Sequence, residues 1–285
     1  MIGKHWIAGG VALLLSAAHV VAGDAPKRVV SIGGGITETV YALGAGSLLV
    51  GADTSSVYPE EATRLPKCGY QRALSAEGVL SLRPDIVLLA GTAGPEMAIR
   101  QLNELGVKTL RLSDDYNIEG VRERIRKIGE VLGKSREAEE LVAKLDAAVA
   151  VLPKVKTRPR VLFLLSRGGG VLMVAGKGTA ADAMIHLAGG SNAGADFSGY
   201  KPVSSESLVA LAPEVILTTS RTLAELGDGG ISKALPGVEL TPAGKKRRFI
   251  VMDDLYLLGF GPRTGEALLE LANQLHSAND LVCRQ

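Results

Sequence analysis

The chain is poor in the side chains that most often build metal and catalytic sites. It has four His and two Cys among 285 residues, and its one Trp, Trp6, and two of its His lie within the first 22 residues. The remaining His186 and His276 are well separated, and neither lies near a G-x-S-x-G motif. A His-rich zinc or manganese site and a serine hydrolase are therefore not expected. Cys68 and Cys283 could pair in an oxidising compartment, and the sequence leaves this open.

The chain also lacks a surplus of charge of either sign. Removal of residues 1–22 takes away Lys4 and no acid, which leaves 31 basic and 30 acidic side chains. Proteins that bind nucleic acid usually carry a clear basic surplus. We therefore expect no nucleic-acid partner.

The first 22 residues are typical of a secretory signal peptide. Lys4 gives a positive start, residues 7–18 are apolar, and residues 20–22 form a small-residue cleavage site. The apolar run is short for a membrane span and is interrupted by Gly and Ser. No Cys stands at the cleavage point, so we expect an exported, soluble chain that is cleaved near Ala22 and carries no lipid anchor.

One stretch of the sequence occurs twice. Residues 68–89 read CGYQRALSAEGVLSLRPDIVLL, and residues 199–218 read GYKPVSSESLVALAPEVILT. In both, a Gly-Tyr loop leads to Ser-x-Glu, in which Ser75 or Ser204 can cap a helix and the Glu lies in its first turn. A two-turn amphipathic helix, a Pro and an apolar strand-like run follow. Two copies in register predict a duplicated lobe.

Strand-like and helical segments alternate along the rest of the chain, which implies parallel sheets with helices on both faces. Residues 135–152 contain no Gly or Pro and predict one long, stiff helix that stops at Pro153. After it the pattern restarts, so we expect an α/β fold of two Rossmann-like lobes with little relative motion on binding. The expected boundaries are a signal peptide at 1–22, a lobe at 23–133, the connecting helix at 134–156 and a lobe at 157–285.

Two glycine-rich turns invite a nucleotide-binding interpretation, and both fail it. Gly33–Gly35 follow a predicted strand, but Glu38 stands where the dinucleotide fingerprint requires its third Gly. Residues 175–178, AGKG, lack the first Gly and the final Ser or Thr of a P-loop. The sequence therefore favours a tight strand-to-helix turn and argues against an exported Rossmann-type enzyme.

The string from Gly69 to Asp85, GYQRALSAEGVLSLRPD, resembles the haem-binding loop of the periplasmic haem-binding proteins of bacterial haem ABC importers. Further matching strings are MVAG at 173–176, TAADA at 179–183, LAGG at 187–190 and GYKP at 199–202. The resemblance covers essentially the whole mature chain. It implies the fold of the class III periplasmic binding proteins, two α/β lobes joined by one long helix, a group that also includes cobalamin and siderophore carriers.

The resemblance further implies that Tyr70 is the axial phenolate ligand of ferric haem. Ferric iron and a nearby cation both favour the phenolate over the phenol. Arg221 matches the family's partner of that phenolate, and Arg72 is a second candidate. For an isolated Tyr the alternative is a half-buried aromatic side chain, and for Arg221 an ordinary surface residue. The twin position, Tyr200, favours a place in the cleft for both tyrosines.

Two more basic residues lie in loops that should face the cleft. Arg167 and Lys201 are candidates to pair with the haem propionates. No His or Met is clearly placed as a sixth ligand, so we expect five-coordinate, high-spin iron. The number of haems bound is left open.

Glu77 and Glu206 are acids at the same position of the two repeats. Their alternative role is a favourable charge at a helix start. In the wider group, matching glutamates dock on Arg residues of the permease, so we expect these two to do the same. The implied partners are the permease and ATPase of an ABC importer, with an outer-membrane haem receptor possible upstream.

We therefore expect a monomeric periplasmic carrier of haem that is not an enzyme. The alternative is a carrier of the same fold for cobalamin or a ferric siderophore. Cobalamin carriers often have aromatic walls, whereas the mature chain lacks Trp. Siderophore carriers favour cationic groups, which Arg72, Arg167, Lys201 and Arg221 could supply.

Overall fold

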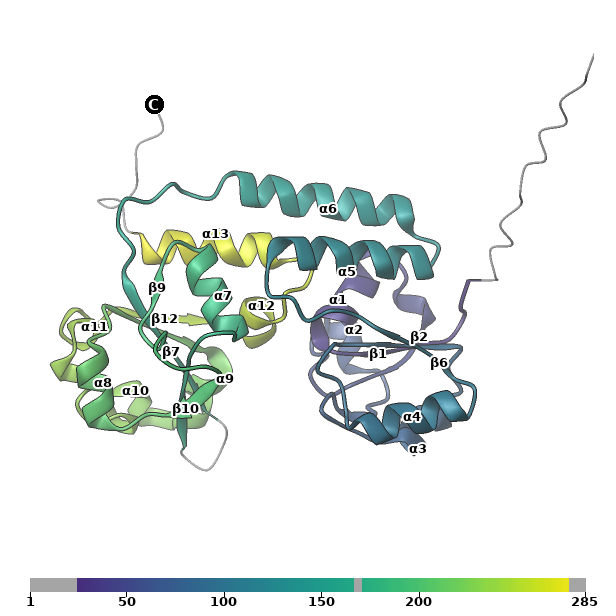
Figure 1. Ribbon diagram of the computed structural model, residues 1–285, viewed down its shortest axis with the longest axis horizontal. Coiled ribbons are helices and arrows are strands. Elements are labelled where there is room, and N and C mark those ends of the chain that lie inside the picture. Colours follow the sequence, from purple (N-terminus) through teal and green to yellow (C-terminus); the bar gives the residue numbers. More distant parts are fainter. Residues whose placement is uncertain (1–24, 167–170, 277–285) are drawn as a thin grey trace, which may run out of the picture.

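A computed structural model describes residues 25–166 and 171–276 of the chain (Figure 1). The predicted signal peptide, Arg167 and Cys283 lie outside these residues. Two α/β lobes stand side by side, and the helix α6 (Ser135–Ala150) runs along one side of both (Figure 1). Within the described residues, no helix is both long and apolar enough to cross a membrane.

The first lobe contains a parallel sheet with strand order β2-β1-β5-β6. Its inner strands β1 and β5 are buried because apolar runs such as VVSI are covered on both faces, whereas the edge strand β6 is partly exposed. Helices α1 and α5 pack on one face, and α3 and α4 on the other. The elements of this lobe are β1 (Val29–Ile32), α1 (Gly34–Ala42), η1 (Gly46–Leu48), β2 (Leu49–Ala52), α2 (Glu60–Thr63), β3 (Gly69–Tyr70), β4 (Ala73–Leu74), α3 (Ala76–Ser81), β5 (Ile86–Leu89), α4 (Glu96–Glu104), β6 (Lys108–Arg111) and α5 (Ile118–Val131).

The second lobe contains a mixed sheet of order β10-β8-β7-β11-β12, with β9 beside β7. It departs from the expected parallel arrangement at β8 and β10, which are antiparallel to their neighbours. Only residues 167–171 separate β7 from β8, too few for a parallel crossover. The elements of this lobe are β7 (Arg160–Ser166), β8 (Leu172–Ala175), α7 (Ala180–Leu187), β9 (Ser191–Asn192), β10 (Tyr200–Pro202), α8 (Ser205–Leu211), β11 (Val215–Thr219), α9 (Ser220–Leu226), η2 (Gly227–Gly229), α10 (Gly230–Ala234), η3 (Val238–Leu240), α11 (Pro242–Lys246), β12 (Phe249–Met252), α12 (Asp254–Leu258) and α13 (Thr264–Leu275).

The two copies of the repeat fold alike. The Ser75 side chain accepts a hydrogen bond from the Gly78 N–H (3.1 Å) at the start of α3. Ser204 accepts one from the Ser207 N–H (3.2 Å) at the start of α8. Both predicted caps are confirmed, and each orphan helix donor gains an acceptor.

The acid that follows each repeat's Pro also has the same role in both lobes. Asp85 accepts a hydrogen bond from the Arg28 N–H (2.9 Å), which precedes β1. Glu214 accepts one from the Arg160 N–H (2.8 Å), at the start of β7. Each acid therefore fixes where its lobe's central strand begins beside the repeat strand, as a duplicated lobe should.

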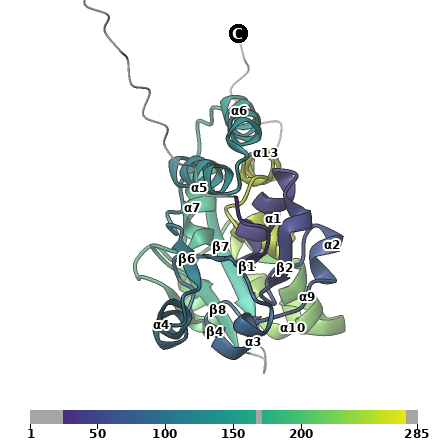
Figure 2. The ribbon, with the colours of Figure 1, turned by 90° about the vertical axis from the view of Figure 1, so that its right-hand side faces the viewer.

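The lobes share more than the connecting helix. The predicted long helix is present as α6, and it packs on α5 of the first lobe and α13 of the second (Figures 1 and 2). The largest hydrophobic core runs through this joint, with Ile125 of α5, Leu145 of α6 and Leu271 of α13 all buried in it. A continuous core makes the joint stiff, because separating the lobes would expose packed apolar surface.

Candidate functional site

The carboxyl edges of the two sheets face each other. A side chain at Gly34, just after β1, would meet Leu255, just after β12, at 2.6 Å. A side chain at Gly35 would overlap the carbonyl oxygen of Gly259 in the second lobe. Of the three glycines, Gly33 also has φ +117, which favours glycine. The glycine turn is therefore a tight turn that lets the lobes approach, at the sheet edge where α/β proteins bind ligands.

Tyr70 lies on a small hairpin that is attached to this edge of the first sheet. In β3 and β4, Tyr70 is paired with Ala73. The Thr54 N–H donates to the Gly69 carbonyl (2.9 Å), and the Gly94 N–H donates to the Gln71 carbonyl (2.9 Å). Loops that follow β2 and β5 thus hold the hairpin on both sides.

The Tyr70 side chain extends from this hairpin into solvent. It is 46% exposed, and within the described part of the chain its hydroxyl has no hydrogen-bond partner. A large, amphipathic side chain in this state, on a fixed backbone, is available to a ligand.

Two carboxylates that were not predicted from the sequence hold the loops beneath the hairpin in place. Asp53, fully buried, accepts hydrogen bonds from the Gly33 N–H (2.9 Å) and the Ser56 hydroxyl (2.8 Å). Asp114 accepts one from the Gly91 N–H (2.9 Å). Each follows a strand of the first sheet within three residues, which is the pattern that could have identified them.

Arg72 lies at the tip of the hairpin, near a pair of aromatic rings that spans the two lobes. The rings of Tyr116 and Phe260 are 5.2 Å apart, and Arg124 donates to the Phe260 carbonyl (3.0 Å). Burial, followed by the charge of Asp114, raises the pKa of Tyr116, and the positive charges of Arg72 and Arg124 oppose this. The guanidinium of Arg72 is itself exposed, so it can turn toward a bound anion.

Arg221 lies at the carboxyl edge of the second sheet, in the first turn of α9. Its N–H donates to Asp254 (3.2 Å), and its Nε forms an ion pair with Glu225 (3.1 Å). The side chain is 78% exposed, and such pairs contribute only about 0–1 kcal/mol. Among the described residues, Arg221 makes no hydrogen bond with Tyr70. The structure therefore puts the two residues on facing sheet edges without joining them.

The other basic and aromatic candidates have different surroundings. Tyr200 pairs with Ala175 in the sheet and is half-buried against the main core, unlike the exposed Tyr70. The Lys201 ammonium lies 5.1 Å from the centre of the Phe197 ring. Glu77 and Glu206 are exposed in the first turns of α3 and α8.

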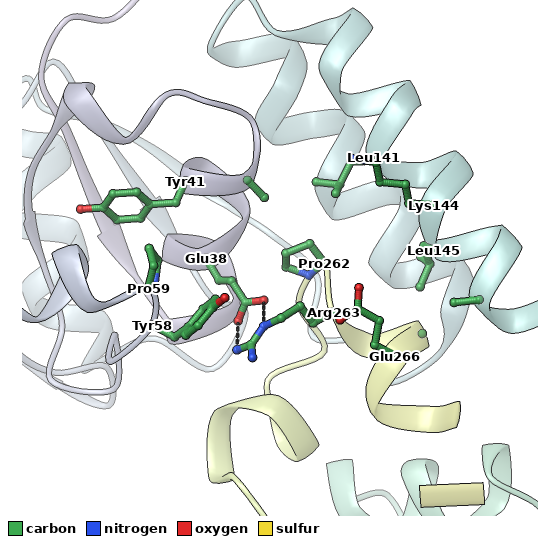
Figure 3. A pocket seen from close by; sticks show the side chains of 13 residues that line it. Glu38, Tyr41, Tyr58, Pro59, Leu141, Lys144, Leu145, Pro262, Arg263 and Glu266 are labelled. Atoms are coloured by element: carbon green, nitrogen blue, oxygen red, sulfur yellow. Dashed lines mark hydrogen bonds and ion pairs between the residues drawn. The ribbon is translucent and has the colours of Figure 1, made fainter. Parts of the chain in front are cut away.

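A cavity of about 420 Å³ lies where α1, α6 and α13 meet, at the joint between the lobes (Figure 3). Inside it, Arg263 binds the almost fully buried Glu38 through two hydrogen bonds of 2.6 and 2.9 Å. The guanidinium also lies 3.6 Å from the centre of the Tyr58 ring. Glu38, which interrupts the glycine fingerprint, is thus half of an ion pair between the lobes. Tyr70 is not among the residues that line this cavity.

The two histidines of the described residues lie away from the carboxyl edges of the sheets and make hydrogen bonds with backbone carbonyls. His186 bonds to the Asp182 carbonyl (2.8 Å), and His276 is buried with its Nε2 3.1 Å from the Ala188 carbonyl. Across residues 25–166 and 171–276, no group of three or more His, Cys, Asp or Glu side chains could hold a metal ion. Cys68 is buried, and burial raises the pKa of its thiol.

Two α/β lobes with a stiff joint and facing carboxyl edges can hold a ligand between them. Residues 29–256 match the family described as periplasmic binding protein, and the chain belongs to that family, which makes it a substrate-binding protein and not an enzyme. Among solved structures, it is similar to the periplasmic heme-binding protein RhuT from Roseiflexus sp. RS-1 in apo form, with 42% identity, a TM-score of 0.83 and coverage of 87% of this chain and 97% of that one. It is also similar to the periplasmic heme-binding protein BhuT in complex with two hemes. The identity is 44%, the TM-score is 0.80, and the match covers 87% of this chain and 97% of that one.

Sequence relatives extend the range of ligands. The chain is 30% identical to the uncharacterised ABC transporter substrate-binding lipoprotein YvrC of Bacillus subtilis, over 88% of this chain and 80% of that protein. It is 27% identical to a cobalamin-binding protein of Halobacterium salinarum, over 88% of this chain and 70% of that protein. The chain is therefore a transport protein of the haem, vitamin B12 and siderophore type.

Proposed function

We propose that this chain binds haem between its lobes, with Tyr70 as the iron ligand, and delivers it to an ABC importer of the inner membrane. The observation that carries the proposal is the exposed phenol of Tyr70, whose hydroxyl has no partner among the described residues. It lies on a hairpin held from both sides at the ligand-binding edge of the sheet. Tyr is a known proximal ligand of haem iron in proteins.

The cations assigned to the site have the chemistry that a tyrosinate needs. Arg72 and Arg221 are exposed. Arg72 lies on the hairpin of the first lobe and Arg221 at the carboxyl edge of the second sheet, so either can turn toward the phenolate oxygen. A nearby positive charge favours the charged form of the ligand. Lys201 and Arg167 then remain for the carboxylates of the propionates.

Similarity to heme-binding proteins at 42–44% identity supports haem over cobalamin, since the cobalamin and vitamin B12 carriers are 27–28% identical to this chain. The protein's place would be the periplasm, after cleavage near Ala22. Glu77 and Glu206, exposed in the first turns of equivalent helices, are the proposed contacts with the permease. The ATPase acts behind that permease.

The test is a hemin titration of the mature chain followed by absorbance. We expect a saturable Soret shift and a tyrosinate charge-transfer band. Both should be lost in Tyr70→Ala, and the band should be lost in Tyr70→Phe, which keeps the ring and removes the hydroxyl. Tyr41→Phe is the matched control, since it makes the same change at a tyrosine of α1 that packs against the core and is not a site candidate, and it should bind hemin as the parent does.

Other outcomes separate the alternatives. Haem binding that survives Tyr70→Ala would contradict Tyr70 as the iron ligand, but the protein would still be a haem carrier. Saturable binding of cyanocobalamin or of a ferric siderophore, without saturable binding of hemin, would overturn haem as the cargo.

A further inference from the structure

Another tyrosine, Tyr116, lies at the carboxyl edge of the first sheet, on the loop between β6 and α5. It is half-buried, and its ring centre lies 5.2 Å from that of Phe260, which follows α12 in the second lobe. The ring of Tyr116 therefore bridges the two lobes at the edge where α/β proteins bind ligands.

The loop that carries this tyrosine is bonded to the segment that holds the Tyr70 hairpin. Asp114, two residues before the tyrosine, accepts a hydrogen bond from the Gly91 N–H (2.9 Å). Three residues further along that segment, the Gly94 N–H donates to the Gln71 carbonyl (2.9 Å), next to Tyr70. The two tyrosines thus lie on neighbouring, mutually bonded parts of the same sheet edge.

Arg124 of α5 fixes the loop against the second lobe. Its guanidinium donates to the carbonyls of Ser113 (2.8 Å) and Asp115 (3.2 Å) on the loop, and to that of Phe260 (3.0 Å). Phe260 has φ +45, which is costly for a residue with a side chain, and such strain often occurs where a protein holds a ligand. The contacts on both sides keep the Tyr116 ring in one place.

The hydroxyl of Tyr116 has no hydrogen-bond partner within the described part of the chain. In residues 25–166 and 171–276, His276 alone has a buried side-chain nitrogen or oxygen without a partner, so the Tyr116 hydroxyl reaches solvent. Burial, followed by the charge of Asp114, raises the pKa of Tyr116, so the group stays a neutral phenol that can donate. A fixed ring with a free donor at this edge is available to a ligand.

The charges around this hydroxyl favour an anionic acceptor. The positive charges of Arg72 and Arg124 both act on it, and among the described residues Arg124 donates to carbonyls and to no carboxylate. Asp114 opposes them, but its carboxylate already accepts backbone N–H groups. At the periphery of haem, the hydrogen-bond acceptors are the two propionate carboxylates, and a hydrogen bond to a carboxylate is charge-assisted.

We propose that Tyr116 is a specificity-determining residue of the cargo site, and that its hydroxyl donates a hydrogen bond to one propionate of the haem. Tyr70 then binds the iron and Tyr116 binds a carboxylate. Two tyrosines from neighbouring loops thereby fix both the position and the rotation of the macrocycle, and the second favours a free carboxylate over a neutral group. This inference rests on the proposed function in haem binding.

The test compares hemin with hemin dimethyl ester, which keeps the iron and the macrocycle but makes both carboxylates neutral. Affinities are measured by absorbance titration in one detergent for the parent and for Tyr116→Phe, which keeps the ring and removes the hydroxyl. We expect the Kd for hemin to rise about 10-fold, because a hydrogen bond to a charged group is lost. The Kd for the ester should change less than about twofold, because the ester carries no charge. Tyr41→Phe is the matched control and should change neither Kd.

The tyrosinate charge-transfer band of the hemin complex should persist in Tyr116→Phe, since Tyr70 is intact. An unchanged Kd for hemin in this variant would overturn the inference. Equal losses for hemin and its ester would overturn it too, because the hydroxyl would then not act on a carboxylate, and so would loss of the band, which would place Tyr116 at the iron. A parent chain that binds no hemin would overturn haem as the cargo and this inference with it, whereas the other failures leave hemin binding by the parent intact.

Discussion

At the scale of single residues, the cations of the candidate site make few interactions within the protein that ligand binding would break. In the ion pair of Arg221 with Glu225, the Arg221 side chain is 78% exposed and that of Glu225 is 29% exposed, so water reaches the pair and its contribution to folding is small. Arg72 is exposed at a hairpin tip. Because neither guanidinium is tied into the core, both can turn to a ligand without disturbing the fold.

The replacement Arg221→Gln separates a binding role from a structural one. We expect the urea midpoint to stay within experimental error of the parent, because the guanidinium lost from the ion pair is largely in solvent. The hemin complex should keep its tyrosinate band only at higher pH than the parent, since a cation that favours the phenolate is gone. The measurement is a pH titration of the charge-transfer band, with Arg64→Gln, which removes another exposed ion pair, as control. Equal pH profiles for all three proteins would contradict a role for Arg221.

At the scale of elements, the joint between the lobes is held by a buried ion pair as well as by α6. The side chain of Glu38, in α1, is 5% exposed, and that of Arg263, after α12, is 24% exposed. The two residues therefore differ in burial, and so in the cost of leaving one of them without its partner. Removal of the Arg leaves a buried carboxylate alone, whereas removal of the carboxylate leaves a guanidinium that still lies over the Tyr58 ring.

We accordingly expect Arg263→Gln to lower the free energy of unfolding by roughly 3–5 kcal/mol, and Glu38→Gln to lower it by clearly less. The double variant should lose less than the sum of the two single variants, because the unpaired carboxylate is absent from it. Urea unfolding followed by circular dichroism measures all three. Arg126→Gln is the control, since its two hydrogen bonds to Glu139 are exposed and its loss should change little. Equal losses in the two single variants would contradict the asymmetry.

At the scale of the whole molecule, one core belongs to both lobes. Apolar residues from the first sheet, α5, α6, α13 and the second sheet form one buried cluster, and each lobe has a smaller cluster of its own on the other face of its sheet. The lobes should therefore move little on binding and should unfold together.

The absence of Trp after Trp6 offers a direct measurement. Tyr41→Trp, in α1 of the first lobe, reports on the shared core, and Phe249→Trp reports on the separate core of the second lobe, because these are the clusters against which the two side chains pack. We expect the fluorescence transitions of the two variants in urea to coincide with the loss of circular dichroism measured for each. Two separated transitions within one variant would contradict a shared core.

Much of the architecture follows from local patterns in the sequence. The Ser-x-Glu caps, the strand expected at residues 28–32 and the helix after residue 134 all depend on neighbours along the chain. Each is present in the structure, the strand as Val29–Ile32. The sequence pattern indicated a segment at residues 231–235, where α10 lies, but it did not indicate α9, α11 or α12, because segments of five to seven residues carry too little periodicity. It also missed Asp53 and Asp114, whose role depends on loops brought together from elsewhere.

The sequence by itself determined the duplicated lobe, the long helix between the lobes and the repeat that contains Tyr70, because spacing, capping and turn residues act over a few positions. Only the tertiary structure decided which distant residues meet. Glu38 and Arg263 are separated by 225 positions, and Arg124 and Phe260 by 136, yet both pairs close the joint between the lobes. No local pattern encodes such pairs, since they exist only after two separately patterned lobes pack edge to edge.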